Sequence, residues 1–515
     1  MSPKPPARNP AIIAALLFCG VVVGLPFAGI GLALRNPFGL IPAPPLEWAR
    51  LLSTGWRSLA LALGVASACL LLGTFFAFVQ IRWRFRGSNL LTRLTVLPLV
   101  LPSFLLAATL RESFAPLGPV GKTLGFQGRF EGMLPALLVL ILCCTPYVQL
   151  IVAAALRQLP AQSEEAARSL GASQSRVLLR VLFPGLRPAL GFSALLVMVY
   201  ALADFGAVAV LDARVLTFEL YQFVGRGGIQ APLMGLLLCA FVIPLILIGR
   251  GLTGSGANLS QARKRCVEPC SPTLIQRLTA LILIGSYLAL ALVLPTAMCL
   301  QMAFSGELTA PILRPLATTL MLGIFGGLLT LMLGGLPAAL VTASKKSQRS
   351  WLELATFLAS GVPGVLVAFG LLQLMLRLPS GNLRDFGEGG LLLLFGLAMR
   401  FSSHAYAALK PALLTESDSP IEAARSLGAS PWRRFWTLRL PGLTPALMAG
   451  FLLSFIAIVK ELPITIMLLP AGESSLATRI FDAHEDAHLA DLGVSALTLI
   501  GMVLAAQALL RRWER

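Results

Sequence analysis

Charged residues are scarce in this sequence. Only 12% of its 515 residues are Asp, Glu, Lys or Arg, 57% are hydrophobic, and the mean hydropathy is +0.82. A soluble chain of this length needs far more charge to cover its surface, so the composition excludes a water-soluble globular protein. Cysteine is also sparse, with 8 residues that fall mainly in apolar stretches, apart from Cys266 and Cys270. This placement favours plain thiols over a disulfide scaffold or a metal site.

Long apolar stretches make up most of the chain. They run for about 20 residues between clusters of charge, as in membrane-spanning helices, and lack the alternation over about 10 residues that is typical of barrel strands. We therefore predict an all-α polytopic membrane protein. The twelve expected spans are 11–34, 58–80, 94–110, 133–155, 189–210, 231–249, 278–303, 317–343, 354–376, 389–409, 446–469 and 492–510.

The positive charge is distributed unevenly between the loops. With the N-terminus inside and the first span uncleaved, 27 of the 41 basic residues and only 8 of the 23 acidic residues fall on the inner side. This distribution follows the positive-inside rule for proteins embedded in membrane lipid. The rule accounts for the net charge of +18, so the charge does not indicate a nucleic-acid partner. The sequence predicts a multi-pass membrane protein with both termini cytoplasmic.

An internal repeat divides the chain. The nine residues Glu165–Ser173 recur unchanged as Glu422–Ser430, an offset of 257, and Pro102 aligns with Pro363 at an offset of 261. We expect two homologous halves of six helices each, related by an axis along the membrane normal. The predicted domains are an N-terminal span and outer loop (1–52), the first homologous half (53–250), a linker and seventh span (251–312), the second homologous half (313–510) and a cytoplasmic tail (511–515).

Each copy of the repeat is predicted to form two short helices joined at a glycine. Ser419 and Pro420 form a helix start, the Glu-Ala-Ala-Arg-Ser-Leu run favours a helix, and Gly428 permits the left-handed cap that ends it. A second helix then begins at Ser430. Both copies fall in predicted cytoplasmic loops, so we expect a compact knob there, repeated twice, which either binds an external partner or packs against its own helices.

The spacing within each knob resembles a known family signature. It is similar to the cytoplasmic loop of permeases of binding-protein-dependent ABC importers. That loop has Glu-Ala-Ala, three residues, Gly, nine residues, an apolar residue, one residue of any kind and then Leu-Pro. This sequence departs from the signature at the apolar position, usually isoleucine, which is Val181 and Leu438, and at the leucine before the proline, which is Phe183 in the first copy. The resemblance implies the type I importer permease fold and coupling loops that dock on an ATPase. The implied docking residues are Glu165, Ala166, Ala167, Gly171, Glu422, Ala423, Ala424 and Gly428.

The same resemblance implies a place in the bacterial inner membrane, and it implies partners and cargo. Two copies of an ATPase subunit on the cytoplasmic face would bind ATP-Mg, a periplasmic substrate-binding protein would deliver substrate, and this chain itself would hold no cofactor and catalyse no reaction. Ala203-Asp204-Phe205-Gly206 and Lys460-Glu461-Leu462-Pro463 resemble the ferric-iron, thiamine and phosphonate branch. Together with Leu-Ala-Thr-Arg at 476–479, they favour ferric iron. Thiamine, a phosphonate or another small solute is the alternative.

Charged residues within predicted spans are candidates for the translocation path, because such charges usually face a bundle interior. Asp204 and Glu461 are 257 positions apart and therefore equivalent. The two carboxylates would line a cation route or hold a gate closed, with Lys460 moderating the repulsion between them. The alternative is a structural ion pair between Lys460 and one of the two carboxylates. Arg400 and His404 are further candidates. The alternatives are that the Arg400 side chain only snorkels, which means that it extends to the membrane surface, and that His404 only forms a hydrogen bond to a backbone carbonyl. A carrier driven by protons on the two carboxylates is the rival transport mechanism.

One motif indicates a different class of protein. His484-Glu485-Asp486-Ala487-His488 matches H-E-x-x-H, which on a helix places two imidazoles on one face as zinc ligands of a protease. The only other histidine lies in a predicted span, and the motif occurs in one half only. The alternatives are an accessory metal contact through His484 and His488, or a solvated acidic loop or partner surface that includes Asp482, Asp486 and Asp491.

Overall fold

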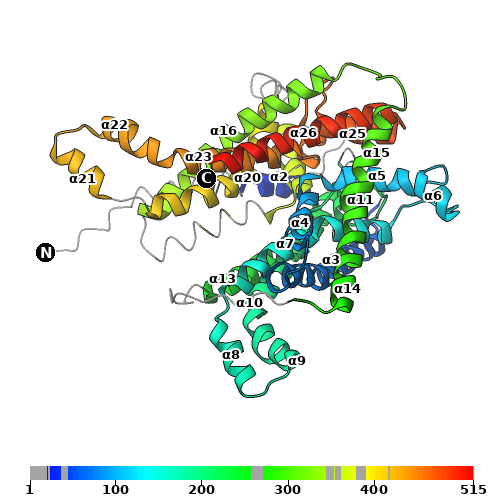
Figure 1. Cartoon of the computed structure of the whole chain (residues 1–515). Coiled ribbons are helices and arrows are strands. Elements are labelled where there is room, and N and C mark those ends of the chain that lie inside the picture. Colours follow the sequence, from blue (N-terminus) through cyan, green and yellow to red (C-terminus); the bar gives the residue numbers. More distant parts are fainter. Residues whose placement is uncertain are drawn as a thin grey trace. The chain divides into compact units, whose positions relative to one another are not determined.

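The computed structural model shows a helical protein. It describes residues 20, 24–35, 45–224, 226, 228–256, 271–343, 353, 356, 361–377, 390–415 and 418–513. Every element in these residues is a helix (Figure 1). The all-α fold class predicted from composition is therefore confirmed. Cys19, Cys266, Cys270 and parts of the predicted first and ninth spans lie outside the described residues.

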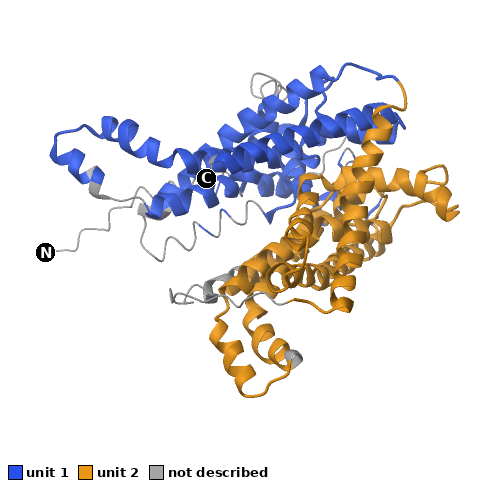
Figure 2. Ribbon diagram, viewed as in Figure 1, with its two compact units in different colours: residues 1–46, 223–233, 307–515 blue, residues 47–222, 234–306 orange. Residues whose placement is uncertain are grey.

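The chain forms two compact units, each made of separate stretches of sequence (Figure 2). Unit 2 comprises Glu47–Gln222 and Met234–Gly306, and unit 1 comprises Met1–Leu46, Phe223–Leu233 and Glu307–Arg515. Each unit is described by itself below.

Unit 2 contains one copy of the repeat. Its elements are α3 (Trp48–Arg82), α4 (Ser88–Leu94), the 3-10 helix η1 (Leu97–Val100), α5 (Ser103–Phe114), α6 (Pro119–Leu124), α7 (Met133–Gln158), α8 (Ala161–Ser169), α9 (Gln174–Val177), the π-helical turn η2 (Leu178–Leu182), α10 (Phe183–Ala203), α11 (Gly206–Val210), α12 (Leu216–Gln222), most of α13 (Gln230–Gly256), α14 (Leu274–Leu288), the π-helical turn η3 (Ala289–Val293) and α15 (Leu294–Ala303).

Unit 1 contains the other copy. Its elements are α2 (Gly24–Arg35), α16 (Leu313–Ala343), α18 (Gly364–Met375), α20 (Leu392–Thr415), α21 (Asp418–Ser426), α22 (Pro431–Arg434), the π-helical turn η5 (Phe435–Arg439), α23 (Leu440–Val459), α24 (Pro463–Leu468), α25 (Leu476–Glu485) and α26 (Leu489–Trp513).

The helix that precedes each repeat packs with the other repeat. In unit 2, α14 contacts α3 and α15 contacts α5, and the Tyr287 hydroxyl of α14 donates to the Leu142 carbonyl of α7 at 2.9 Å. In unit 1, α2 packs on α18 so closely that a Cβ on Gly29 would lie 1.9 Å from the Gly370 carbonyl oxygen. Only glycine permits this approach. Each compact unit is thus completed by a helix from the opposite half of the sequence.

The two repeats share their internal packing. A Cβ on Gly73 of α3 would lie 2.6 Å from the Val148 Cβ of α7, and a Cβ on Gly334 of α16 would lie 2.7 Å from the Ala405 Cβ of α20. These glycines are 261 positions apart, and Val148 and Ala405 are 257 apart. The same close helix contact therefore occurs at equivalent positions in both repeats.

Three π-helical turns share one cause. A proline is the second residue after the end of each turn: Pro184 after η2, Pro295 after η3 and Pro441 after η5. A proline has no N–H to donate to the carbonyl four residues earlier, and its ring clashes with that carbonyl in a regular α-helix. The wider π-helical turn accommodates the proline while the helix continues.

The membrane spans differ in part from the prediction. Among the described residues, nine helices are long and apolar enough to cross a membrane. The predicted span 94–110 is instead a bent pair, Ser88–Val100 and Ser103–Phe114, with a 100° angle between its parts. The break falls at Leu101-Pro102, because the residue before a proline disfavours helical backbone. α2 and α18 are shorter apolar helices, next to residues outside the described part of the chain.

Candidate coupling loops and broken spans

The first knob consists of α8 and α9, which project from the rest of unit 2 (Figure 1). Gly171 ends α8 in left-handed backbone, with φ +77°. Its amide donates to the Arg168 carbonyl at 2.9 Å, and the Ala172 amide donates to the Ala167 carbonyl at 3.0 Å. The second of these bonds spans five residues, as in the Schellman motif that commonly terminates helices at glycine.

The second knob, formed by α21 and α22, repeats this geometry. Gly428 has φ +78°, its amide donates to the Arg425 carbonyl at 3.0 Å, and the Ala429 amide donates to the Ala424 carbonyl at 3.0 Å. The predicted helix, glycine cap and second helix are therefore confirmed in both copies. The docking role of these residues stays a prediction.

Each knob presents small and apolar groups to solvent. Glu165, Ala166 and Gly171 are exposed, as are their counterparts Glu422, Ala423 and Gly428, while Ala167 and Ala424 are half-buried. Sequence reasoning missed the leucines that directly precede the glycines. Leu170 is 88% exposed and Leu427 is 87% exposed. Their signal was a large apolar residue at the same position of both copies, with only alanines as apolar neighbours in the repeated nonapeptide.

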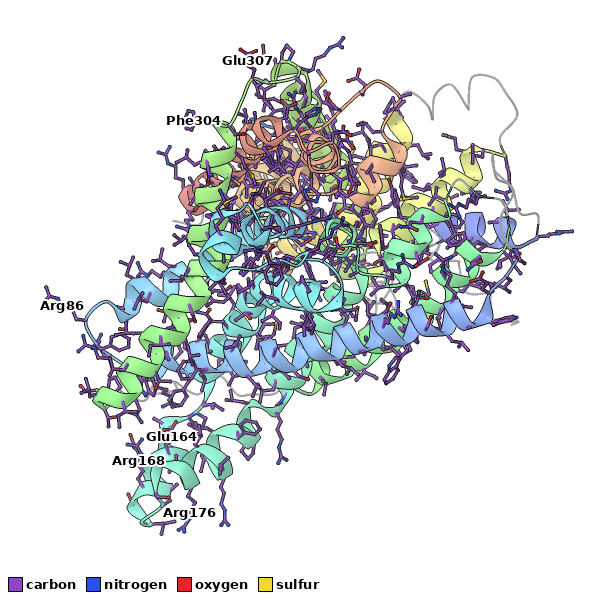
Figure 3. All side chains as sticks on the ribbon, turned by 90° about the vertical axis from the view of Figure 1, so that its right-hand side faces the viewer. Arg86, Glu164, Arg168, Arg176, Phe304 and Glu307 are labelled. Carbon is purple, nitrogen blue, oxygen red and sulfur yellow. The ribbon has the colours of Figure 1, made fainter. Side chains whose placement is uncertain are left out.

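A buried ion pair joins the first knob to its unit. Glu164 on α8 accepts a hydrogen bond from the Arg82 guanidinium at the end of α3, and the two side chains are 4% and 7% exposed. Figure 3 shows Glu164 on the projecting helix pair, together with Arg168 and Arg176. The residues at the equivalent positions of the second repeat, Ile421 and Ala343, are uncharged.

In unit 2, Asp204 lies at a helix break instead of inside a span. Helix α10 ends at Ala203, and Asp204 continues in extended backbone before α11 begins. The Asp204 carboxylate accepts hydrogen bonds from the Ser103 hydroxyl at 2.5 Å and from the Ala207 amide at 2.9 Å. The carboxylate thus holds the start of α11 beside the first residue of α5, at the 100° bend.

Glu461 occupies the equivalent break in unit 1. Helix α23 ends at Val459, before both Lys460 and Glu461, so neither lies within a continuous span as predicted. The buried Glu461 carboxylate lies 3.6 Å from the Arg400 Nε, and the Arg400 Nη1 donates to the Val362 carbonyl at 2.7 Å. The arginine therefore ties the carboxylate to the backbone that precedes α18.

Two of the alternatives for α20 are decided by this geometry. The Arg400 side chain is 15% exposed and pairs with Glu461, so the prediction that it only snorkels is wrong. His404 Nδ1 lies 3.3 Å from the Phe401 carbonyl oxygen, one turn earlier in the same helix. The backbone contact considered for His404 is therefore present. Whether these residues line a translocation path stays a prediction.

The H-E-x-x-H sequence does not form a zinc-binding helix. His484 is buried in the last turn of α25, which ends at Glu485, and Ala487 has left-handed backbone with φ +57°. His488 therefore lies outside the helix, and the two imidazoles do not share one helical face. In the described part of the chain no group of three or more His, Cys, Asp or Glu side chains is placed to hold a metal ion.

The surrounding loop is also less solvated than predicted. Asp491 is 3% exposed and accepts a hydrogen bond from the Arg479 Nη2 at 2.7 Å. That guanidinium also donates to the Ala310 carbonyl at 2.5 Å. Asp482 and Asp486 are exposed as predicted. Partial burial raises the pKa of the Asp482 carboxyl, and the neighbouring carboxylates of Asp486 and Glu485 raise it further.

The chain resembles curated proteins over its whole length. It is 26% identical to the Fe(3+)-transport system permease protein FbpB 2 of Haemophilus influenzae, covering 96% of this chain and 97% of that protein. It is 23% identical to the ferric transport system permease protein FbpB of Actinobacillus pleuropneumoniae, over 86% of this chain and 69% of that protein. The putrescine transport system permease protein PotI of Escherichia coli is 34% identical over 28% of this chain and 51% of its own length.

A family signature occurs twice. Residues 69–254 and 332–510 each match the family described as binding-protein-dependent transport system inner membrane component. The two matches contain the two knobs and the two carboxylate-bearing breaks, and together they span more than half of the chain. The apolar helices agree with a multi-pass inner-membrane protein. The chain therefore belongs to the family of binding-protein-dependent transport system inner membrane components.

Proposed function

We propose that this chain supplies both halves of the translocation pathway of an ATP-driven importer. The observation that carries the proposal is the duplicated knob, with the same hydrogen bonds, the same left-handed glycine and the same exposed leucine in each copy. Two equivalent surfaces suit two copies of one ATPase subunit. ATP-Mg binds to that subunit, so this chain needs no cofactor and performs no covalent chemistry.

The proposed cargo is ferric iron, delivered by a periplasmic substrate-binding protein. The support is the 26% identity to an Fe(3+)-transport permease across 96% of this chain. A putative 2-aminoethylphosphonate transport permease of Salmonella typhimurium is 27% identical but covers only 38% of the chain. Phosphonate and other small solutes are therefore the competing cargoes.

Closure of the ATPase pair would draw the knobs together and rock the two halves between inward-open and outward-open states. This mechanism requires knobs on the cytoplasmic side, and so both termini on that side, as the loop charges favour. Asp204 and Glu461 are buried and bonded at helix breaks. We infer that they hold the bent segments in place during this motion and do not bind cargo directly.

The test is uptake of radiolabelled ferric iron by cells that lack the chromosomal gene and carry either the wild-type chain or Gly171→Pro with Gly428→Pro. Proline fixes φ near −65°, which is incompatible with the +77° and +78° found here, so both caps are lost. We expect iron uptake to be abolished while the amount of chain in the membrane is unchanged. Wild-type uptake by the double variant would overturn the docking role.

The energy source separates this proposal from an ion-coupled carrier. Uptake should stop when ATP is depleted and persist when an uncoupler collapses the proton gradient while ATP is maintained. Loss of uptake with the uncoupler alone would favour a proton-driven carrier. Uptake of a phosphonate or putrescine in place of iron would leave the machinery intact and change only the cargo.

A further inference from the structure

An exposed aromatic cluster marks the second knob. Trp432, Phe435 and Trp436 are 70%, 40% and 50% exposed, and they contact one another, with ring centroids 5.5 Å apart for the two tryptophans and 5.6 Å for Phe435 and Trp436. They are spaced at i, i+3 and i+4, so they form one face of the helical segment. Three large rings held together in solvent indicate a surface that another phase or molecule covers.

The helical segment that carries the cluster contains positive charges and no negative ones. Arg433 is exposed beside Trp432, Arg434 follows it, and Arg439 lies one turn further on. Residues 431–459 contain no Asp or Glu. A face of tryptophan and arginine suits an anionic partner, because guanidinium groups bind phosphate in a bidentate manner and indole rings favour the polar edge of a bilayer.

The length of the helix places this face at the membrane surface. The candidate span Pro431–Val459 has 29 residues, which extend about 43 Å at 1.5 Å per residue. The uncharged part, 440–459, has 20 residues and by itself covers the hydrocarbon core of about 30 Å. Residues 431–439 therefore extend beyond the hydrocarbon into the headgroup layer.

The first repeat lacks this feature. The residues equivalent to Trp432, Phe435 and Trp436, at an offset of 257, are Ser175, Leu178 and Leu179. The repeated nonapeptide just before them is identical in the two copies, so the aromatic residues are an addition to the second knob and not a requirement of the shared helix–glycine–helix fold.

We propose that the aromatic–arginine face, defined as Trp432, Arg433, Phe435 and Trp436, binds the headgroups of anionic phospholipids. The rings lie among the headgroups, and the Arg433 guanidinium pairs with a lipid phosphate. This interaction goes beyond the transport function and does not depend on the identity of the cargo or on an ATPase.

The experiment uses the full chain in nanodiscs, with Trp48, Trp56, Trp83, Trp351 and Trp513 changed to Phe so that emission reports only Trp432 and Trp436. The bilayer is an equal mixture of phosphatidylglycerol and phosphatidylcholine, and bromine is placed near the headgroup of one lipid or the other. We expect roughly fivefold more quenching by brominated phosphatidylglycerol, since each arginine near the surface favours an anionic lipid.

Arg433→Gln is the matched control. It retains both rings and should make the two brominated lipids quench equally. Equal quenching in the chain that retains Arg433 would overturn the anionic preference. Quenching by neither lipid would overturn the proposal. Quenching that disappears when the ATPase subunit is added would also overturn it and would assign the face to a protein partner. A variant that retains only Trp436, with Trp432→Phe, repeats the measurement if the first chain is poorly folded.

Discussion

The buried ion pair between Arg82 and Glu164 holds the first knob against its unit, and removing it should free α8. The proposed change is Glu164→Gln, which keeps the size of the side chain and removes its charge. The guanidinium of Arg82 would then be buried beside a neutral amide. Because Glu164 directly precedes the exposed residues Glu165 and Ala166, loss of the pair acts on the knob directly.

The structure sets the size of the effect. With the two side chains 7% and 4% exposed, the pair is almost fully buried, and removing one partner of such a pair costs about 3–5 kcal/mol. Glutamine still accepts a hydrogen bond, so we take the lower end, about 3 kcal/mol. Since 1.4 kcal/mol corresponds to a factor of ten, the population in which α8 is released from α3 should rise about 100-fold.

Trypsin cleavage at Arg168 measures this release. Arg168 is exposed on α8, and cleavage of a helical site requires local opening. When opening and closing are fast relative to cleavage, the initial rate follows the open population, so we expect cleavage at Arg168 to accelerate about 100-fold in Glu164→Gln. Arg425, the equivalent site on the second knob, provides an internal control and should be cleaved at its wild-type rate.

Two further variants test the cause. Glu165→Gln makes the same chemical change one residue later, at an exposed position, and should leave cleavage at Arg168 unchanged. Arg82→Glu combined with Glu164→Arg should restore much of the protection. The reasoning is refuted if Glu164→Gln accelerates cleavage at Arg168 no more than at Arg425.

Three further predictions concern the remaining parts of the site. Leu170→Ser with Leu427→Ser should abolish co-purification of the ATPase subunit while membrane insertion persists, because both side chains are almost fully exposed; undiminished co-purification would exclude them from docking. Gly364→Ala places a Cβ 2.5 Å from the Glu461 Oε1, so it should lower the free energy of unfolding by about 1–3 kcal/mol. Thermal unfolding measures this loss, and an unchanged midpoint temperature would contradict the tight packing. His484→Ala should leave the zinc content of the purified chain unchanged, whereas loss of bound zinc would revive a metal role for this loop.

The knobs were predictable from sequence because their structure is local. Each is closed by hydrogen bonds that span at most five residues, such as that from the Ala172 amide to the Ala167 carbonyl. A glycine after a helix-forming run determines such a cap wherever it occurs. The exchange of α2 and α14 between the repeats was not predictable, because hydropathy identifies an apolar helix without indicating which other helix it contacts.

The bend at Leu101-Pro102 was missed for a related reason. A window of about 19 residues averages hydropathy over the break and therefore sees one span where the chain turns by 100°. Pro102 and its counterpart Pro363 were visible in the sequence, but they served only to align the repeats. The restriction that proline places on the preceding residue was the local signal for the bend.

The repeat predicts where polar residues lie better than it predicts their partners. Asp204 and Glu461 occupy equivalent helix breaks, yet Ser103 bonds the first and Arg400 pairs with the second. The residues equivalent to these partners are Gly364 and Cys143, so each repeat supplies its partner from a different helix. A buried carboxylate requires a hydrogen-bond donor, but a hydroxyl and a guanidinium both meet that requirement. Duplication thus preserved the backbone break, while the two copies diverged in the charge that surrounds it.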